Sequence, residues 1–185
     1  MAPNATIIKA ELQITDMDRH YYASHNLVLA QHPSETPERL MVRLLAFALH
    51  ADERLEFGRG LSNEDEAALC RRDDTGDIVQ WIDVGLPDES RIRKACARAR
   101  QVIVVTYGGR AADLWWSKNA AGLSRFKNLS VIDLDDDGVD AVTTLFDRGM
   151  RLTAMIQDGE LQLMSSEANV ALRPTVRMAP VSVEA

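Results

Sequence analysis

A single carboxylate, Asp83, stands inside the apolar stretch IVQWIDVG (78–85). Side chains alternate between the two faces of a strand, so Asp83 shares its face with Trp81 and Gly85. An ionised carboxylate on a buried face is costly unless a partner compensates its charge. The residue therefore predicts a metal, an arginine or a helix N-terminus nearby, and Mg²⁺ is a suitable metal because one or two carboxylates with water satisfy it.

A cluster of cations follows this carboxylate in the segment DESRIRKACARAR (88–100). Arg91, Lys94 and Arg98 are spaced by three and four residues, which places them on one face of a helix. The chain carries 21 basic and 28 acidic residues, a net charge of −7, so it does not coat nucleic acid through its overall field. The local stripe indicates phosphate contacts with nucleic acid, and the alternative is a solvated surface that pairs with Asp and Glu.

The segments around Asp83 predict a hairpin, a helix and a strand. AALCRRD (67–73) and IVQWIDVG flank the turn DTGD, as two antiparallel strands do. Asp88 and Glu89 stand at the positive N-terminal end of the helix that follows. QVIVVTY (101–107) is a short apolar run with β-branched residues, which is typical of a fully buried strand.

The rest of the chain also mixes strands and helices. Thr36 and Pro37 mark the start of a long amphipathic helix, as its N-cap and its first residue. ATIIKAELQITD and YASHNLVLAQH predict an N-terminal hairpin, and Asp158-Gly159 forms the two-residue turn of another. This order predicts a mixed α/β (α+β) single domain over residues 1–176, with one sheet, part parallel and part antiparallel, flanked by helices. Residues 177–185 are expected to form a frayed tail.

Other features narrow the class of protein. Cys70 and Cys96 lie far apart without disulfide-framework or zinc-knuckle spacing, which favours a reducing cytoplasm. The N-terminal segment lacks the pattern of a secretion signal. No run of about 18 apolar residues is long enough to span a membrane. We therefore expect a cytoplasmic protein without a membrane segment.

The residues that carry these signals also carry a family resemblance. The block HPSETPERLMVRLLAFALHADERLEFGRGLS, continued by DDTGDIVQWIDVGLPDESRIRKACARAR, resembles the YaeQ family of bacterial proteins. The similarity extends from ATIIKA to IQDGELQL. That family is in turn similar to a compact variant of the PD-(D/E)xK nuclease superfamily. The resemblance implies a restriction-endonuclease-like core, in which a helix, an acidic hairpin, a second helix and a strand surround a Mg²⁺ (or Mn²⁺) site.

The resemblance assigns roles to particular residues. Asp83 matches the acid at the end of the second hairpin strand, and Glu38 matches an auxiliary acidic ligand on the first helix. Two positions depart from the pattern, because Ala68 stands where an acid is expected and Gly85 stands where the lysine is expected. Glu66, two residues before Ala68, would supply the missing acid. Lys94 or Arg91 would replace the lysine.

Three functional hypotheses follow. The first is a Mg²⁺-dependent nuclease, with Asp83, Glu38 and Glu66 as ligands and a cation of the basic helix at the phosphate. Hydrolysis of a phosphodiester needs a metal to generate hydroxide and positive charge to stabilise the transition state. The second is a catalytically inactive nuclease-fold module that binds nucleic acid or a protein partner. The third is that Asp83 only holds the basic helix in place through an arginine.

Overall fold

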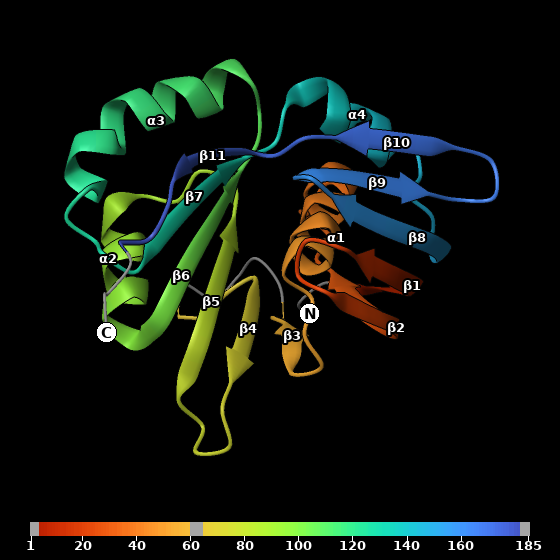
Figure 1. Cartoon of the computed structure of the whole chain (residues 1–185), viewed down its shortest axis with the longest axis horizontal. Helices are drawn as coiled ribbons and strands as arrows, with labels where there is room; N and C mark the ends of the chain where they lie inside the picture. The colour runs from red at the N-terminus through yellow and green to blue at the C-terminus, as the bar shows by residue number, and fades with distance from the viewer. Residues whose placement is uncertain (1–3, 60–64, 182–185) are drawn as a thin grey trace.

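The computed structural model describes residues 4–59 and 65–181. Within these residues the strands form two sheets, with helix α1 (Pro37–His50) packed between them (Figure 1). The mixed α/β class is confirmed, and parallel and antiparallel pairings are both present. The expectation of a single sheet is wrong. No described helix is both long and apolar enough to cross a membrane.

The first sheet joins the two ends of the chain. Its order is β10-β9-β8-β1-β2, and only the β1–β8 pairing is parallel. The predicted turn at Asp158-Gly159 is confirmed, since both residues have positive φ, as a type I′ hairpin turn requires. The strands are β1 (Thr6–Asp16), β2 (Tyr21–Gln31), β8 (Gly149–Gln157), β9 (Glu160–Met164) and β10 (Asn169–Leu172).

The second sheet holds the predicted hairpin around Asp83. Its order is β11-β7-β6-β5-β4-β3, with three parallel strands in the centre and antiparallel strands at both sides. The strands are β3 (Leu55–Phe57), β4 (Leu69–Arg72), β5 (Ile78–Val84), β6 (Ala99–Thr106), β7 (Leu129–Asp133) and β11 (Thr175–Met178). The remaining helices are α2 (Glu89–Arg98), α3 (Arg110–Leu123) and α4 (Asp136–Thr143).

Helix α1 explains why there are two sheets. Every residue from Leu40 to Ala48 is buried, so the helix is apolar almost all the way round. A helix of this kind is stable only when protein covers it on several sides. One side of α1 packs on the first sheet, and another packs on Ile82 and Val84 of β5.

The two faces of β5 belong to different cores. Ile82 and Val84 join the core around α1, whereas Trp81 packs with Ile92 and Ala95 of α2. Helices α2 and α3 cover this second face (Figure 1). Because side chains alternate along a strand, Asp83 faces α2 with Trp81. Helix α2 therefore covers the face of β5 that holds Asp83.

The ordered chain extends beyond the expected boundary at residue 176. Arg177 and Met178 belong to β11, and Arg177 pairs with Asp113 and with Asp133. The Val181 N–H then donates to the Lys127 carbonyl. The segment from residue 177 onward has the composition of a tail. It is held in place because β11 pairs with β7 and Arg177 forms these ion pairs. Residues 182–185 lie outside the described part of the chain.

Candidate functional site

Asp83 lies near the end of β5, where it forms a two-pronged ion pair with Arg91 of α2. The Arg91 Nε lies 2.8 Å from Oδ2, and Nη2 lies 2.9 Å from Oδ1. The Asp83 side chain is only 5% exposed, and that of Arg91 is 26% exposed. Such bidentate, charge-assisted contacts are among the strongest hydrogen bonds in proteins. Both carboxylate oxygens of Asp83 are therefore engaged by a cation that the same chain supplies.

The Arg91 guanidinium is held from several directions. Its Nη2 also donates to the Glu66 carbonyl at 2.8 Å, and its Cζ lies 5.9 Å from the centre of the Trp81 ring. The Arg91 backbone N–H donates to Asp88, the N-cap of α2. Asp88 thus fixes the start of the helix, and the start of the helix places Arg91 against β5.

The other expected metal ligands do not gather around Asp83. The Glu66 carboxylate accepts from the Arg59 backbone N–H at 3.1 Å. Glu38 is in the first turn of α1, on the helix that covers the opposite face of β5. Across residues 4–59 and 65–181, no group of three His, Cys, Asp or Glu side chains is placed to hold a metal ion. The described donor set therefore does not fit a carboxylate-bound Mg²⁺ or Mn²⁺.

The position of the expected lysine is set by the backbone. Gly85 has φ +102°, and its N–H donates to the Val105 carbonyl at 2.9 Å. L-residues with a side chain rarely adopt this conformation, so glycine is favoured here. Lys94, the proposed substitute, is exposed on the outer side of α2. The chain therefore ends β5 in a way that disfavours a lysine beside Asp83.

The cations of α2 divide into two groups. Arg91 points inward, whereas Arg93 and Lys94 are exposed and form no ion pair within the described part of the chain. Arg98 is half exposed, 3.7 Å from Asp65, and its Cζ lies 5.9 Å from the centre of the Trp81 ring. The predicted stripe is thus split, and Arg93, which the spacing argument did not select, joins its exposed part.

Neighbouring groups on this side are either neutralised or unreactive. Arg100 pairs with Asp73 at 2.6 Å, and the hydrogen bond from the Thr75 hydroxyl lowers the pKa of Asp73 to about 2. Burial raises the pKa of the Cys96 thiol on α2 to about 11. Because the thiolate is the nucleophilic form, Cys96 supplies no nucleophile at neutral pH.

A second buried ion cluster was not predicted. Glu35 binds Arg43 through two hydrogen bonds of 2.8 Å and Arg39 through a third. The side chains of Glu35 and Arg43 are almost completely buried, and Arg43 also donates to the Ala30 carbonyl of β2. The signal in the sequence is the single arginine inside the apolar run LMVRLLAFAL. This cluster ties α1 to the first sheet.

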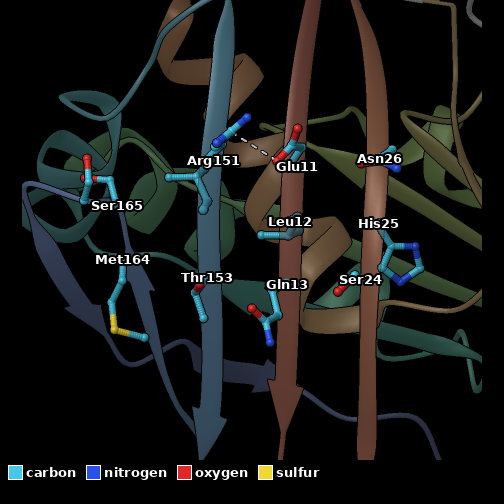
Figure 2. A pocket seen from close by; sticks show the side chains of 12 residues that line it. Glu11, Leu12, Gln13, Ser24, His25, Asn26, Arg151, Thr153, Met164 and Ser165 are labelled. Carbon is cyan, nitrogen blue, oxygen red and sulfur yellow. Dashed lines mark ion pairs between the residues drawn. The ribbon is translucent and has the colours of Figure 1, made fainter.

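A cavity of about 500 Å³ opens on the outer face of the first sheet (Figure 2). Its lining includes Gln13 of β1, Ser24 and Asn26 of β2, and Thr153 of β8. The ion pair between Glu11 and Arg151 borders it, at 3.2 Å. The lining offers amides and hydroxyls, which sequence patterns do not distinguish from an ordinary solvated strand face.

The chain is thus a mixed α/β domain in which a helix separates two sheets and an arginine neutralises a buried acid. The family model described as "YaeQ protein" matches residues 1–174, and the chain belongs to the YaeQ family. It is 46% identical to "Uncharacterized protein YaeQ" of Escherichia coli (strain K12), over 97% of this chain and 99% of that one. The Salmonella typhi protein of the same description is also 46% identical over the same shares.

Solved structures agree with this assignment. The YaeQ protein from Xanthomonas axonopodis pv. citri is 61% identical and superimposes with a TM-score of 0.93, covering 95% of this chain and 99% of that one. YaeQ from Pseudomonas syringae is 31% identical, with a TM-score of 0.90 over 95% of this chain and 97% of that one. These matches confirm the YaeQ resemblance. They give no support to the further relation with PD-(D/E)xK nucleases.

Proposed function

We propose that this protein is a catalytically inactive, nuclease-like module that binds the phosphates of nucleic acid through α2. The observation that carries the proposal is the bidentate contact between Arg91 and Asp83. It neutralises the acid that the nuclease pattern assigns to a metal, and it uses both oxygens that a metal would bind.

Loss of the chemistry follows from the same contacts. A metal would have to displace the guanidinium from a carboxylate whose side chain is only 5% exposed. The displaced Arg91 guanidinium would lose two charge-assisted hydrogen bonds, which are among the stronger kinds in proteins. Glu66 and Glu38 are engaged or placed elsewhere, and Gly85 replaces the lysine. A site of this kind lacks both a generator of hydroxide and a cation for the transition state.

The exposed cations of α2 support binding to phosphates. Arg93, Lys94 and Arg98 are exposed on one helix, beside the pair that anchors it. Contacts from such side chains to phosphate oxygens position a nucleic acid without reading its sequence. Because the chain carries a net charge of −7, binding depends on this local patch and weakens steeply with salt.

Fluorescence anisotropy with labelled duplex DNA, single-stranded DNA and RNA tests the proposal at about 50 to 200 mM salt. Changing Arg93, Lys94 and Arg98 to Ala together should abolish binding or reduce the slope of log K against log salt by about 2 to 3. The matched control changes Lys9 of β1, Arg151 of β8 and Arg148, which precedes β8, to Ala. It removes the same charge and should leave the slope unchanged. Equal losses in both variants, or no binding by wild type at low salt, would overturn the proposal.

A second candidate is the Mg²⁺- or Mn²⁺-dependent nuclease itself. One observation favours it: Arg91 Nη2 contacts both the Asp83 carboxylate and the Glu66 carbonyl, so the Glu66 segment lies beside the acid as the hairpin motif requires. Calorimetric titration with Mn²⁺ compares wild type with Asp83→Ala. Heat of binding seen only in wild type, together with Mn²⁺-dependent cleavage of nucleic acid, would establish catalysis with Asp83 as ligand and Lys94 as the candidate cation.

A further inference from the structure

Strand β2 is a sheet edge without the usual protection. Edge strands normally avoid pairing with other chains by being short, by carrying charges or proline, or by bulging. The strands at the other edges, β10, β11 and β3, have four, four and three residues. By contrast β2, YYASHNLVLAQ, has eleven residues and contains no Asp, Glu, Lys, Arg or Pro. Its pairing with β1 is unbroken from Gln31 to Tyr21, so it has no bulge.

The direction of the free edge groups follows from two hydrogen bonds. The Lys9 N–H of β1 donates to the Arg148 carbonyl, on the β8 side. Along a strand the N–H and C=O of one residue point to the same side, and the side alternates from residue to residue. The backbone groups of odd residues of β1 therefore point to β8, and those of even residues point to β2. The register pairs even residues of β1 with odd residues of β2. The backbone groups of the even residues of β2 therefore point away from β1. The Ala30 carbonyl agrees with this direction, because it accepts a hydrogen bond from Arg43 and not from β1.

The side chains beside this edge are also exposed. Tyr22 and Val28 are 61% and 58% exposed, although both are large and apolar. Between them stand Ser24 and Asn26, which Figure 2 shows on β2, the last strand of its sheet. Among the residues that the structure describes, none pairs with the outward backbone groups of Tyr22, Ser24, Asn26 and Val28, and apolar side chains lie at both ends of this row.

We propose that β2 pairs antiparallel with β2 of a second copy of this chain, in a register centred on His25. This register opposes Tyr22 to Val28 and Ser24 to Asn26. Exposed apolar side chains then meet as cross-strand pairs, and a hydroxyl meets an amide. A shift by two residues in one direction would oppose Tyr22 to Ala30, whose carbonyl already binds Arg43. A shift by two in the other direction would oppose Val28 to His20, which lies outside β2. The pairing joins two five-stranded sheets into one continuous sheet.

We infer a second copy as the partner because pairing about His25 matches like with like. It opposes the apolar Tyr22 and Val28, and it opposes the polar Ser24 and Asn26. Antiparallel pairing of identical edges has two-fold symmetry and closes on itself, so it gives a dimer and not a fibre. The net charge of −7 on each copy is no local obstacle, because β2 carries no acidic residue.

Sedimentation equilibrium over a wide range of concentrations tests the register with two matched variants. Y22K/V28K places lysines directly opposite each other in the dimer and should raise its dissociation constant at least about tenfold. Y22E/V28K occupies the same positions but opposes unlike charges, and it should remain dimeric. I7K, on β1 beside the edge strand, changes an equally exposed side chain and should leave the wild-type constant unchanged.

Amide hydrogen exchange on wild-type protein provides a test that needs no variant. The N–H groups of Tyr22, Ser24, Asn26 and Val28 point away from β1 and should gain protection as the concentration rises, whereas the amide of Lys9 should not change. A monomeric wild type at every concentration would overturn the proposal. Equal effects of Y22K/V28K and Y22E/V28K on the dimer would overturn it as well, since the register requires opposite outcomes.

Discussion

Arg91 of α2 forms a bidentate ion pair with Asp83 of β5, with contacts of 2.8 and 2.9 Å to the two carboxylate oxygens. The acid is buried, and the arginine lies in the first turn of its helix, where the Asp88 cap holds its backbone N–H. The pair therefore answers the cost of a carboxylate on an apolar strand without a metal. It also determines which cations of α2 remain available to a partner.

Replacing Arg91 with Met should lower the free energy of unfolding by about 3 kcal/mol, because Asp83 would stay buried without its cation. Urea denaturation at neutral pH measures this loss. The double variant D83N/R91M removes the stranded charge and should recover part of the stability. If the free energy of unfolding of R91M lay within about 0.5 kcal/mol of the wild-type value, Arg91 would not be the partner that stabilises Asp83.

Gly85→Ala should cost about 1 to 2 kcal/mol through the backbone alone. A Cβ at Gly85 would meet no atom within 4 Å, so the strain comes from φ +102° and not from crowding. Gly85→Lys, which restores the residue of the nuclease pattern, should cost a similar amount and bring no cleavage activity. Gly149→Ala is the matched control, because Gly149 is equally uncrowded and its φ lies outside that region. A neutral G85A would contradict the argument, and urea denaturation of all three variants decides it.

Replacing Arg43 with Met should be among the most damaging single changes, at about 3–5 kcal/mol, because Glu35 would remain buried with a weaker partner. Arg39→Ala removes the other cation of the cluster, but its side chain is 20% exposed. We expect that variant to lose no more than about 1 kcal/mol. Thermal and urea unfolding of the two variants should differ clearly, and equal losses would show that burial does not separate the two contacts.

His50 should make stability fall in mildly acidic solution. Burial, with a smaller contribution from Arg19, lowers the pKa of His50 to about 4 in the folded protein, against about 6.5 when unfolded. Between these values the unfolded chain binds a proton that the folded chain does not, so the free energy of unfolding decreases as pH falls. The loss should be on the order of 3 kcal/mol and complete below pH 4. His50→Gln should lack this loss, which urea denaturation of both proteins at several pH values measures. If the free energies of unfolding of the two proteins fell in parallel as pH decreased, His50 would not be the cause.

Several local features could be predicted because they depend on neighbours in the chain. Thr36 and Pro37 begin α1, and Asp88 caps α2, since a capping side chain bonds amides two or three residues along. The Asp158-Gly159 turn follows from positive φ values that these residues tolerate. Alternation along IVQWIDVG placed Asp83 on the Trp81 face, and the packing of Trp81 with α2 agrees.

Other features depend on contacts between distant parts of the chain. Helix α1 was expected to have one apolar stripe, yet it is buried from Leu40 to Ala48 because a sheet lies on more than one of its sides. Glu35 and Arg43 are eight residues apart, and only the burial of α1 makes their pairing necessary. The resemblance groups Glu38 with Asp83, but α1, which carries Glu38, packs on the Ile82 and Val84 face of β5, and Asp83 lies on the other face.

The sequence by itself determined the hairpin, helix and strand around Asp83, the face of the strand on which Asp83 lies and membership of the YaeQ family, since these rest on short-range patterns and on residue identity. Only the tertiary structure decided the partner of Asp83. The sequence does not distinguish a metal, an arginine and a helix N-terminus as partners of a buried carboxylate. The partner is the group that the fold brings within hydrogen-bonding distance. The α2 cap and the Trp81 face bring Arg91 there, so the charge is neutralised within the chain.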